Sequence, residues 1–356
     1  LEELQTQLLV NLKDPFVRFR DHPLLDEALT LFATTNDTNY HRDRLLSASK
    51  GGVVLNHFEH VWDSELLVRS PLTVASSLLN HIIAVISDEN LWSWDPENEI
   101  LVFDYDQITS KPHKPWIMFE ENAVELSRVD LSSLVGDDEK LAFWINVFNT
   151  LMIHAAIIAK GIPVLELTRE LFDRKTKYNV GCHEFSLEDI RDGILFKNKS
   201  KNIVLGRQFK KSDPRRQFVV QKPIFHDMFA LSDLILQSPM VEVMDYERVY
   251  VQLDMLTTVY LDHFITIDPD EKVVAPALIM DRRALLLEFT KSNDMKASVG
   301  CHIDASVLFV KEYATRFQQE QHKEDIVIFR DTNRTVTNLA CALSRKDYEL
   351  LTKKIS

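Results

Sequence analysis

The stretch that decides the fold is Asp138 to Lys160, DEKLAFWINVFNTLMIHAAIIAK, which is acidic at its start and apolar almost throughout. Acidic residues suit the positive end of a helix dipole. Gly161 and then Pro163 follow the stretch, which is a typical signal for the end of a helix. The pattern therefore predicts one long helix, and because nearly all of its other residues are apolar, we expect it to be buried on all sides.

Asn146, Asn149 and His154 interrupt the apolar surface of this helix. Asn146 and Asn149 are three residues apart and so lie near each other, with His154 farther round the helix. Amide and imidazole side chains orient reacting groups in thiol catalysis, so these three are candidate catalytic residues. The interpretation that we favour is structural: a buried Asn amide usually bonds to neighbouring backbone.

Residues 142–146 read Ala-Phe-Trp-Ile-Asn, and Phe148, Asn149 and His154 follow them. On this pattern the chain resembles the DUF547 family over residues 126 to 285. Further blocks that are similar to the family lie at residues 161–163, 178–181, 185–190, 193–195 and 213–218. The resemblance implies a compact α+β domain, found alone or joined to other modules such as coiled coils and DEP domains.

The resemblance also implies where this chain departs from its relatives. After the Asp-Pro-Arg block the family carries Cys-Gly and a Ser-Cys-Pro-like turn, whereas Val219 to Asp227 reads VVQKPIFHD. Cys182 replaces a preferred second Gly, and an Ile-Glu-His pattern has become Ile190-Arg191-Asp192. If the family uses that cysteine as a nucleophile, this chain has lost it and is a degenerate member. His226 lies within the altered block and is a further candidate base.

The rest of the chain favours an α+β fold that is predominantly helical. Apolar residues at three- and four-residue steps predict helices near residues 1–12, 23–32, 70–86, 246–262, 281–289, 306–319 and 336–351. Strand-like runs lie at residues 91–94, 100–103, 217–220, 264–267, 272–274 and 325–329. A helix followed by a hairpin, as between residues 70 and 103, is typical of a winged-helix or DEP-like module.

These patterns divide the chain of 356 residues into three units. Residues 1–110 form a helical N-terminal unit, residues 111–285 the DUF547-like domain, and residues 286–356 a helical extension packed on the core. The linker candidate is Lys111 to Pro115, which holds two prolines and no apolar side chain apart from them.

Composition excludes several classes of protein. With 54 acidic and 41 basic residues the formal charge is -13, the opposite sign from a protein that binds nucleic acid over its whole surface. No uninterrupted apolar run reaches the roughly 18 residues of a membrane span. Three sparse cysteines favour a reducing compartment, so we expect an intracellular protein, cytoplasmic or nuclear.

The tripeptide Gly-Cys-His occurs twice, at residues 181–183 and 300–302, which raises the question of a zinc site. Adjacent Cys and His rarely hold one tetrahedral ion together, and the usual Cys-x-x-Cys pair is missing. Neighbouring side chains in a strand also point to opposite faces, which disfavours Cys182 and His183 as a thiol–imidazole pair. We therefore expect no metal and no cofactor.

A basic segment between residues 197 and 216 stands out in this acidic chain. Its basic residues are Lys197, Lys199, Lys201, Arg207, Lys210, Lys211, Arg215 and Arg216. They could bind phosphate, RNA or an acidic peptide. A solvated loop is the simpler interpretation, because few aromatic side chains are interleaved with them.

Three functional hypotheses follow. The first is a non-catalytic scaffold, a pseudoenzyme whose partners are other proteins. The second is a hydrolase or transferase that uses His154 and Asn149 with an unidentified nucleophile. The third, weaker one is binding of RNA or phosphate through residues 197–216.

Overall fold

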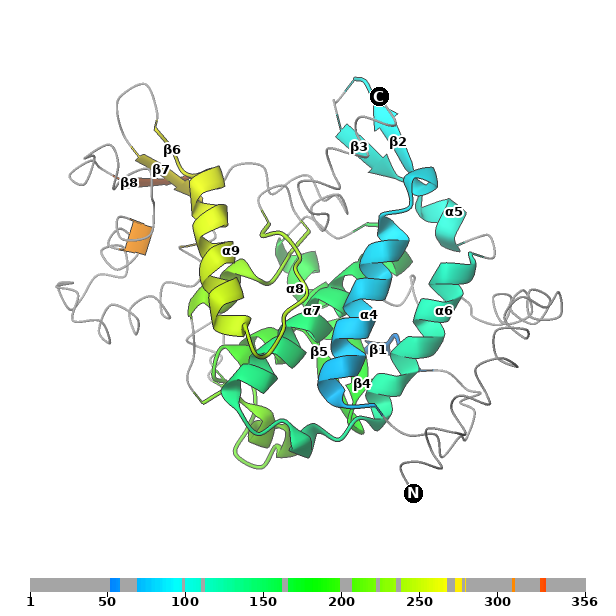
Figure 1. The fold of residues 1–356 in the computed structure, drawn as a ribbon, viewed down its shortest axis with the longest axis vertical. Coiled ribbons are helices and arrows are strands. Elements are labelled where there is room, and N and C mark those ends of the chain that lie inside the picture. The colour runs from blue at the N-terminus through cyan, green and yellow to red at the C-terminus, as the bar shows by residue number, and fades with distance from the viewer. Residues whose placement is uncertain are drawn as a thin grey trace.

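A computed structural model describes residues 52–57, 69–97, 100–109, 113–161, 166–198, 207–221, 225–234, 238–267, 273–276, 279, 309–310 and 327–330 (Figure 1). Helices dominate these residues, and the strands form small sheets of two or three. The predicted fold class, α+β and predominantly helical, is therefore confirmed. The predicted helices at residues 1–12, 23–32, 281–289 and 336–351, and all but two residues of the one at 306–319, lie outside the described residues.

The α-helices are α4 (Pro71–Ile86), α5 (Tyr105–Thr109), α6 (Lys114–Ala123), α7 (Asp137–Ala159), α8 (Glu166–Lys175) and α9 (Val249–Phe264). A π-helix, η4 (Asp189–Leu195), and the 3-10 helices η1 (Glu89–Leu91), η2 (Val124–Arg128), η3 (Leu131–Ser133), η6 (Pro214–Phe218) and η7 (Phe225–Phe229) complete the helical elements.

The strands are β1 (Val53–Val54), β2 (Trp92–Asp95), β3 (Ile100–Phe103), β4 (Thr176–Val180), β5 (His183–Ser186), β6 (Thr266–Ile267), β7 (Val273–Pro276) and β8 (Val327–Arg330). They form three sheets, with orders β1-β4-β5, β2-β3 and β6-β7-β8. The predicted hairpin is confirmed as the antiparallel pair β2–β3, in which Trp92 lies opposite Phe103.

Helix α7 is the centre of the fold, and its ends follow the expected chemistry. At the start, the Glu139 carboxylate accepts hydrogen bonds from the backbone N–H groups of Val135 and Gly136, at 2.8 and 2.9 Å. At the end, Lys160 adopts a left-handed conformation with φ of 54°, and Gly161 N–H bonds back to the Ala156 carbonyl at 2.8 Å. Both groups of bonds satisfy backbone atoms that a helix end leaves unpaired.

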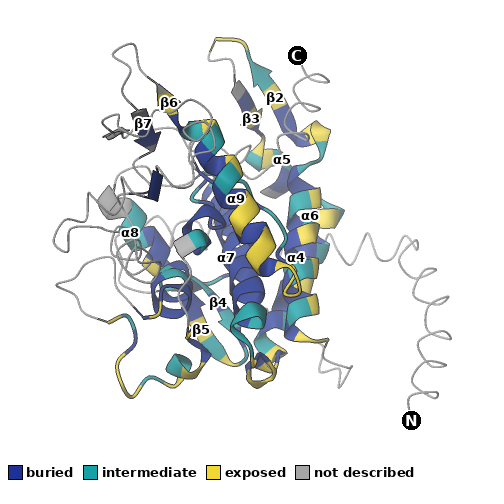
Figure 2. Cartoon of the chain, turned by 60° about the vertical axis from the view of Figure 1, so that its left-hand side comes forward, coloured by how far each residue is buried: buried dark blue, intermediate teal, exposed yellow. Residues whose placement is uncertain are grey.

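Every residue from Lys140 to Ala159 is buried, as the sequence predicts (Figure 2). Helix α4 lies beside α7, and α6 lies beside α4 (Figure 1). The buried stripe of α4, which includes Leu78, Leu79 and Ile82, belongs to the same hydrophobic core as α7. Helix α7 is long and apolar enough to cross a membrane by length and composition, but it lies wholly inside the fold, as the central helix of a globular core does.

The strand predicted at residues 217–220 is wrong. Residues 214–218 instead form the 3-10 helix η6, in which Asp213 is the N-cap and accepts a hydrogen bond from Arg215 N–H at 2.9 Å. An Asp-Pro pair favours the start of a helical turn, because Pro fixes φ near the helical value and needs no partner for its nitrogen. Phe218, Val219 and Val220 are nevertheless buried, which is why the run reads as apolar.

Trp144 occupies the core, as the predicted burial of the helix on all sides implies. Among the described residues its ring contacts are with Phe143, at 4.9 Å between centroids, and Phe185 of β5, at 4.6 Å. Residues four apart on a helix can pack together, but the ring of Trp144 does not stack on that of Phe148, which is also fully buried. A helix enclosed on all sides lets side chains pack against other elements instead of against their own turn.

Replacing Trp144 tests this packing. Trp144→Ala is expected to lower the free energy of unfolding by about 3–5 kcal/mol, the usual range for truncation of a large buried aromatic ring. Trp144→Phe should cost much less, since it keeps most of the volume and removes an indole N–H that has no hydrogen-bond partner among the described residues. Denaturant unfolding measures both variants. A loss below about 1 kcal/mol for Trp144→Ala would contradict the core placement.

Candidate functional site

Asn146 and Asn149 of α7 both bond to backbone far away in the sequence. Asn146 donates from Nδ2 to the Met244 carbonyl at 2.9 Å and accepts at Oδ1 from Met244 N–H at 2.8 Å. Asn149 donates to the Ala230 carbonyl at 2.8 Å and accepts from Ser232 N–H at 3.1 Å. Each amide thus donates to one backbone carbonyl and accepts from one backbone N–H, as the backbone of a neighbouring strand would. These bonds connect α7 to backbone that belongs to no helix or strand.

His154 lies one to two turns later and meets a different set of neighbours. Its Nδ1 atom is 2.7 Å from the Tyr178 hydroxyl on β4, and its Nε2 atom is 4.0 Å from a carboxylate oxygen of Glu120 on α6. Trp116 and Phe119 of α6 place their rings edge-on to the imidazole, each at 5.1 Å. We call Glu120, His154 and Tyr178 the His154 cluster.

The electrostatics of the His154 cluster favour neutral groups. Burial raises the pKa of Glu120 to about 8, and Glu121 beside it adds to the effect. Burial, helped by the charge of Glu120, also raises the pKa of Tyr178 well above its ordinary value. The side chain of Glu120 keeps 15% of its surface exposed, whereas that of His154 keeps 1%. The cluster therefore holds a protonated carboxyl at neutral pH, with a narrow contact to solvent at Glu120.

The candidate catalytic residues are consequently not brought together. Asn146 and Asn149 bond to the segment between residues 230 and 244, whereas His154 bonds to β4 and lies near α6. Asn146, Asn149 and His154 are 1%, 0% and 1% exposed. All three side chains are thus sealed in the core.

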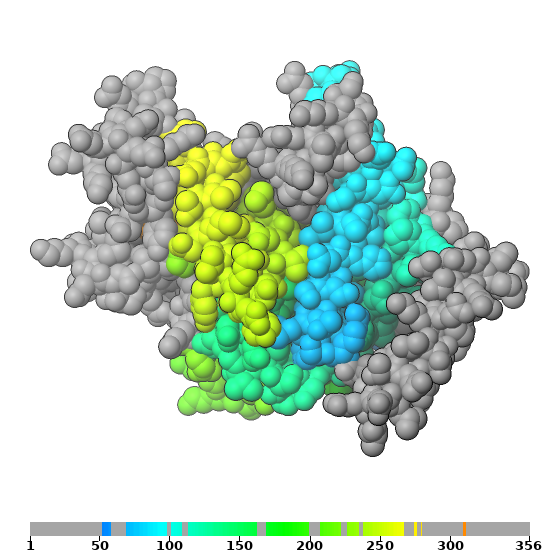
Figure 3. All heavy atoms as spheres, in the orientation of Figure 1, coloured from blue at the N-terminus to red at the C-terminus, as the bar shows by residue number. Residues whose placement is uncertain are grey.

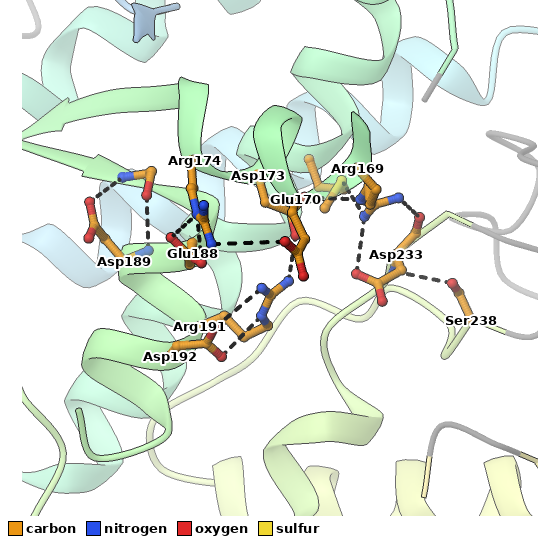
Figure 4. Close-up of polar contacts among 12 residues, drawn as sticks. Arg169, Glu170, Asp173, Arg174, Glu188, Asp189, Arg191, Asp192, Asp233 and Ser238 are labelled. Carbon is orange, nitrogen blue, oxygen red and sulfur yellow. Dashed lines mark hydrogen bonds and ion pairs between the residues drawn. The ribbon is translucent and has the colours of Figure 1, made fainter. Parts of the chain in front are cut away.

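An ion-pair network surrounds Arg191 and Asp192, two residues at which the resemblance implies a departure from the family (Figure 4). Arg191 pairs with Asp173 at 2.7 Å and with Asp192 at 3.2 Å. Arg169 pairs with Asp173 at 3.0 Å and with Asp233 at 3.2 Å. Burial alone would raise the pKa of Asp173, but Arg169 and Arg191 outweigh it and lower that pKa. Each charged group of the network therefore has at least one partner of opposite charge within it.

Residues 131–261 match the model of a family described as "Protein of unknown function, DUF547". The chain contains a DUF547 domain. The comparison with curated proteins gave no match, and neither did the comparison with solved structures. The matched residues include α7, β4, β5 and the ion-pair network, while Glu120 precedes them in the chain.

The altered block of the DUF547 domain places His226 and Asp227 in η7. Burial lowers the pKa of His226 to about 4, against the opposing charge of Asp254 on α9, whose carboxylate oxygen is 3.8 Å from Nε2. Asp227 is fully buried, and burial raises its pKa well above the ordinary value. Within the described part of the chain neither of its carboxylate oxygens has a hydrogen-bond partner. His226 is thus neutral near pH 7, and Asp227 is held as the neutral acid.

Cys182 lies in the turn between β4 and β5 of the DUF547 domain. Gly181 and Cys182 both have positive φ, 53° and 65°, which is the geometry of a two-residue type I′ hairpin. The Cys182 thiol is free and exposed, and among the described residues no three possible ligands gather as a metal site would require. Cys301 and Cys341 lie outside the described residues.

In the basic segment, Arg215 is bonded to other residues of the fold, whereas several of the other basic side chains are exposed to solvent. Arg215 pairs with Asp213 at 2.9 Å and Asp189 at 3.0 Å, and its guanidinium lies 4.5 Å from the centre of the Phe209 ring. It therefore serves the fold. Lys197, Arg207, Lys210 and Lys211 are exposed, Arg216 is partly buried, and Lys199 and Lys201 lie outside the described residues.

Sequence reasoning missed Glu120 and the role of Tyr178. The Tyr178 block marks kinship with the family, but no spacing in the sequence shows that its hydroxyl meets His154. Glu120 lies on an ordinary amphipathic helix next to Glu121, where a carboxylate predicts only a solvated face.

Asn149→Ala tests the structural role of the amides. The substitution leaves a buried carbonyl and a buried N–H unpaired, so we expect a loss of at least about 2 kcal/mol in the free energy of unfolding. Asn122→Ala, at an exposed position of α6, is the matched control and should stay within about 0.5 kcal/mol of the wild type. Unchanged or increased stability of Asn149→Ala, as active-site replacements often show, would refute the structural role.

The raised pKa of Glu120 predicts a pH dependence of stability. Between its ordinary pKa of 4.5 and about 8, the folded protein keeps a proton that the unfolded chain releases. The free energy of unfolding must therefore fall as pH rises through this window. Glu120→Gln removes the titrating group and should make the decline shallower, whereas Glu97→Gln in the exposed turn after β2 should not. Urea unfolding from pH 5 to pH 9 decides the matter, and identical slopes for wild type and Glu120→Gln would disprove the assignment.

Proposed function

We propose that this chain is a non-catalytic, intracellular protein-interaction protein, a scaffold built on a degenerate DUF547 domain. The observation that carries the proposal is the state of the polar side chains on α7. Both Asn amides are bonded to backbone, and His154 is 1% exposed. A catalytic amide or imidazole must contact the substrate, and these three side chains are too buried for a substrate to reach them.

The departures from the family pattern support the same conclusion. Arg191 and Asp192, which replace a Glu-His pair, are matched in an ion-pair network. Val219 and Val220, at the start of the stretch where the family carries Cys-Gly, are buried in the core. These side chains are therefore engaged within the fold.

A hydrolase or transferase remains the second candidate, and one observation favours it. Of the three residues of the His154 cluster, all of which the structure describes, Glu120 alone has appreciable exposure to solvent. Its pKa of about 8 suits proton transfer near neutral pH. The nucleophile of such an enzyme is not identified. Binding of RNA or phosphate by the exposed Lys210 and Lys211 is weaker still, because Arg215, the best-placed guanidinium, is already paired.

Glu120→Gln separates the scaffold from the enzyme. Near pH 7 the carboxyl is protonated, so the amide has nearly the same shape and charge but cannot transfer a proton. A scaffold should keep its melting temperature, its associated proteins by proximity labelling, and its ability to rescue cells that lack it. Glu121→Gln, at the exposed neighbouring position, is the control. Loss of rescue by Glu120→Gln alone, with melting temperature and associated proteins unchanged, would establish the enzyme instead.

A further inference from the structure

Helix α9 carries apolar side chains on two faces, and among the described residues only one of these faces is buried. The covered face packs into the core through Val249, Leu253, Leu256, Tyr260 and Leu261. A helix that is apolar all round is normally covered all round. The other face of α9 therefore requires an explanation.

The uncovered face carries a stripe of exposed hydrophobic side chains. Val251, Met255 and Val259 follow one another at steps of four residues and are 66%, 49% and 46% exposed. Tyr250, about 100° round the helix from Val251, and Tyr246, in the turn before the helix, are also exposed. Figure 3 shows the side chains of α9, in yellow, on the surface that faces the viewer.

The stripe and these two tyrosines together account for most of the exposed large hydrophobic side chains of the described residues. There are seven of these, and five fall between Tyr246 and Val259, while the other two are Val102 and Val135. Scattered exposed apolar residues need no explanation, but a contiguous group marks an interaction surface.

Acidic side chains surround the stripe. Asp245, Glu247 and Asp254 are exposed, and Asp262 is partly buried. The exposed basic groups nearby are Arg248 and His263. The local charge is therefore negative, in a chain whose formal charge is -13. An apolar stripe with an acidic border is complementary to an apolar stripe with a basic border.

We propose that this surface, which we call the α9 face (Tyr246, Tyr250, Val251, Met255 and Val259), binds a basic amphipathic helix of a partner protein. This inference rests on the proposed interaction function. The four-residue spacing of the stripe forms a ridge that fits between the side chains of another helix. The bound helix presents apolar anchors at three- and four-residue steps, and its Lys or Arg residues face Asp245, Glu247 and Asp254.

Two other occupants fit the charges less well. A second copy of the chain would bring two acidic borders together, at an electrostatic cost. The apolar face of residues 1–12 within this chain is accompanied by Glu2 and Glu3 and by no basic residue. A basic helix from elsewhere avoids both conflicts.

The test uses the full chain and a fluorescent peptide of about 18 residues, with Leu at the apolar positions of an amphipathic helix and Lys at the others. The peptide should bind the wild type, and Met255→Asp and Val251→Asp should each weaken binding by about tenfold or more, the effect of losing a central apolar anchor. Both positions are exposed, so the variants should keep the wild-type melting temperature. Val102→Asp, at an exposed position of β3, is the matched control and should bind like the wild type.

A second peptide, with Glu in place of Lys, tests the charge argument and should bind at least about tenfold more weakly than the first. Peroxide should oxidise Met255 readily in the isolated chain and more slowly when the Lys peptide is bound.

Four results would overturn the inference. The first two are equal binding of the Lys peptide to wild type and Met255→Asp, and equal binding of the two peptides. The third is a concentration-dependent dimer that Met255→Asp abolishes, which would assign the face to a second copy. The fourth is slow oxidation of Met255 in the isolated chain that becomes fast in Leu8→Asp, which would assign it to residues 1–12. None of these results changes the outcome of the Glu120→Gln experiment, so failure of this inference and failure of the proposed function are distinguishable.

Discussion

The structure depends on the burial of α7. A helix enclosed from Lys140 to Ala159 cannot leave amide side chains to solvent, so a buried Asn on it needs partners inside the protein. Asn146 bonds to the backbone of Met244, and Asn149 bonds to the backbone of Ala230 and Ser232. These three backbone residues belong to no helix or strand. The two amides therefore satisfy α7 and this backbone at once, and this mutual dependence couples the middle of the chain to its later part.

Charged groups follow the same rule around α8 and η4. Asp173 and Asp192 are buried, and Arg191 pairs with both. Such buried pairs contribute little net stability, since the cost of desolvation offsets much of the attraction, but removing one partner is expensive. The network therefore acts mainly to hold α8 and η4 in one arrangement. Gly193 in η4 lets the Phe209 ring pack closely against that helix. A Cβ atom at this position would come within 2.4 Å of the ring.

The sequence predicts the elements whose signals are local. Periodicity and end chemistry give α4 and α7, and alternation with a turn gives the β2–β3 hairpin. Local patterns give the wrong element at η6, where an apolar run near Phe218 is buried without forming a strand, because burial and strand pairing are separate requirements. Local patterns also do not predict that Glu120 lies near His154. That contact depends on how α6 crosses α7, and a tertiary crossing leaves no mark in local periodicity. The proposed domain borders at residues 110 and 285 remain predictions.

Two kinds of surface thus accompany a core in which the polar groups of α7 are committed to structure. Glu120 gives the His154 cluster its narrow contact with solvent, and the α9 face offers apolar side chains within an acidic border. More exposed side chains belong to the α9 face than to the His154 cluster, and this difference supports the proposal of an interaction protein.

The most direct test of the central claim is hydrogen exchange at the backbone amides of Ser232 and Met244. Both N–H groups donate to Asn side chains of α7 and belong to no helix or strand. If the amides of α7 hold the fold together, these two hydrogens exchange as slowly as those of α7 itself, through global unfolding. Exchange at the rate of an exposed loop would contradict the account.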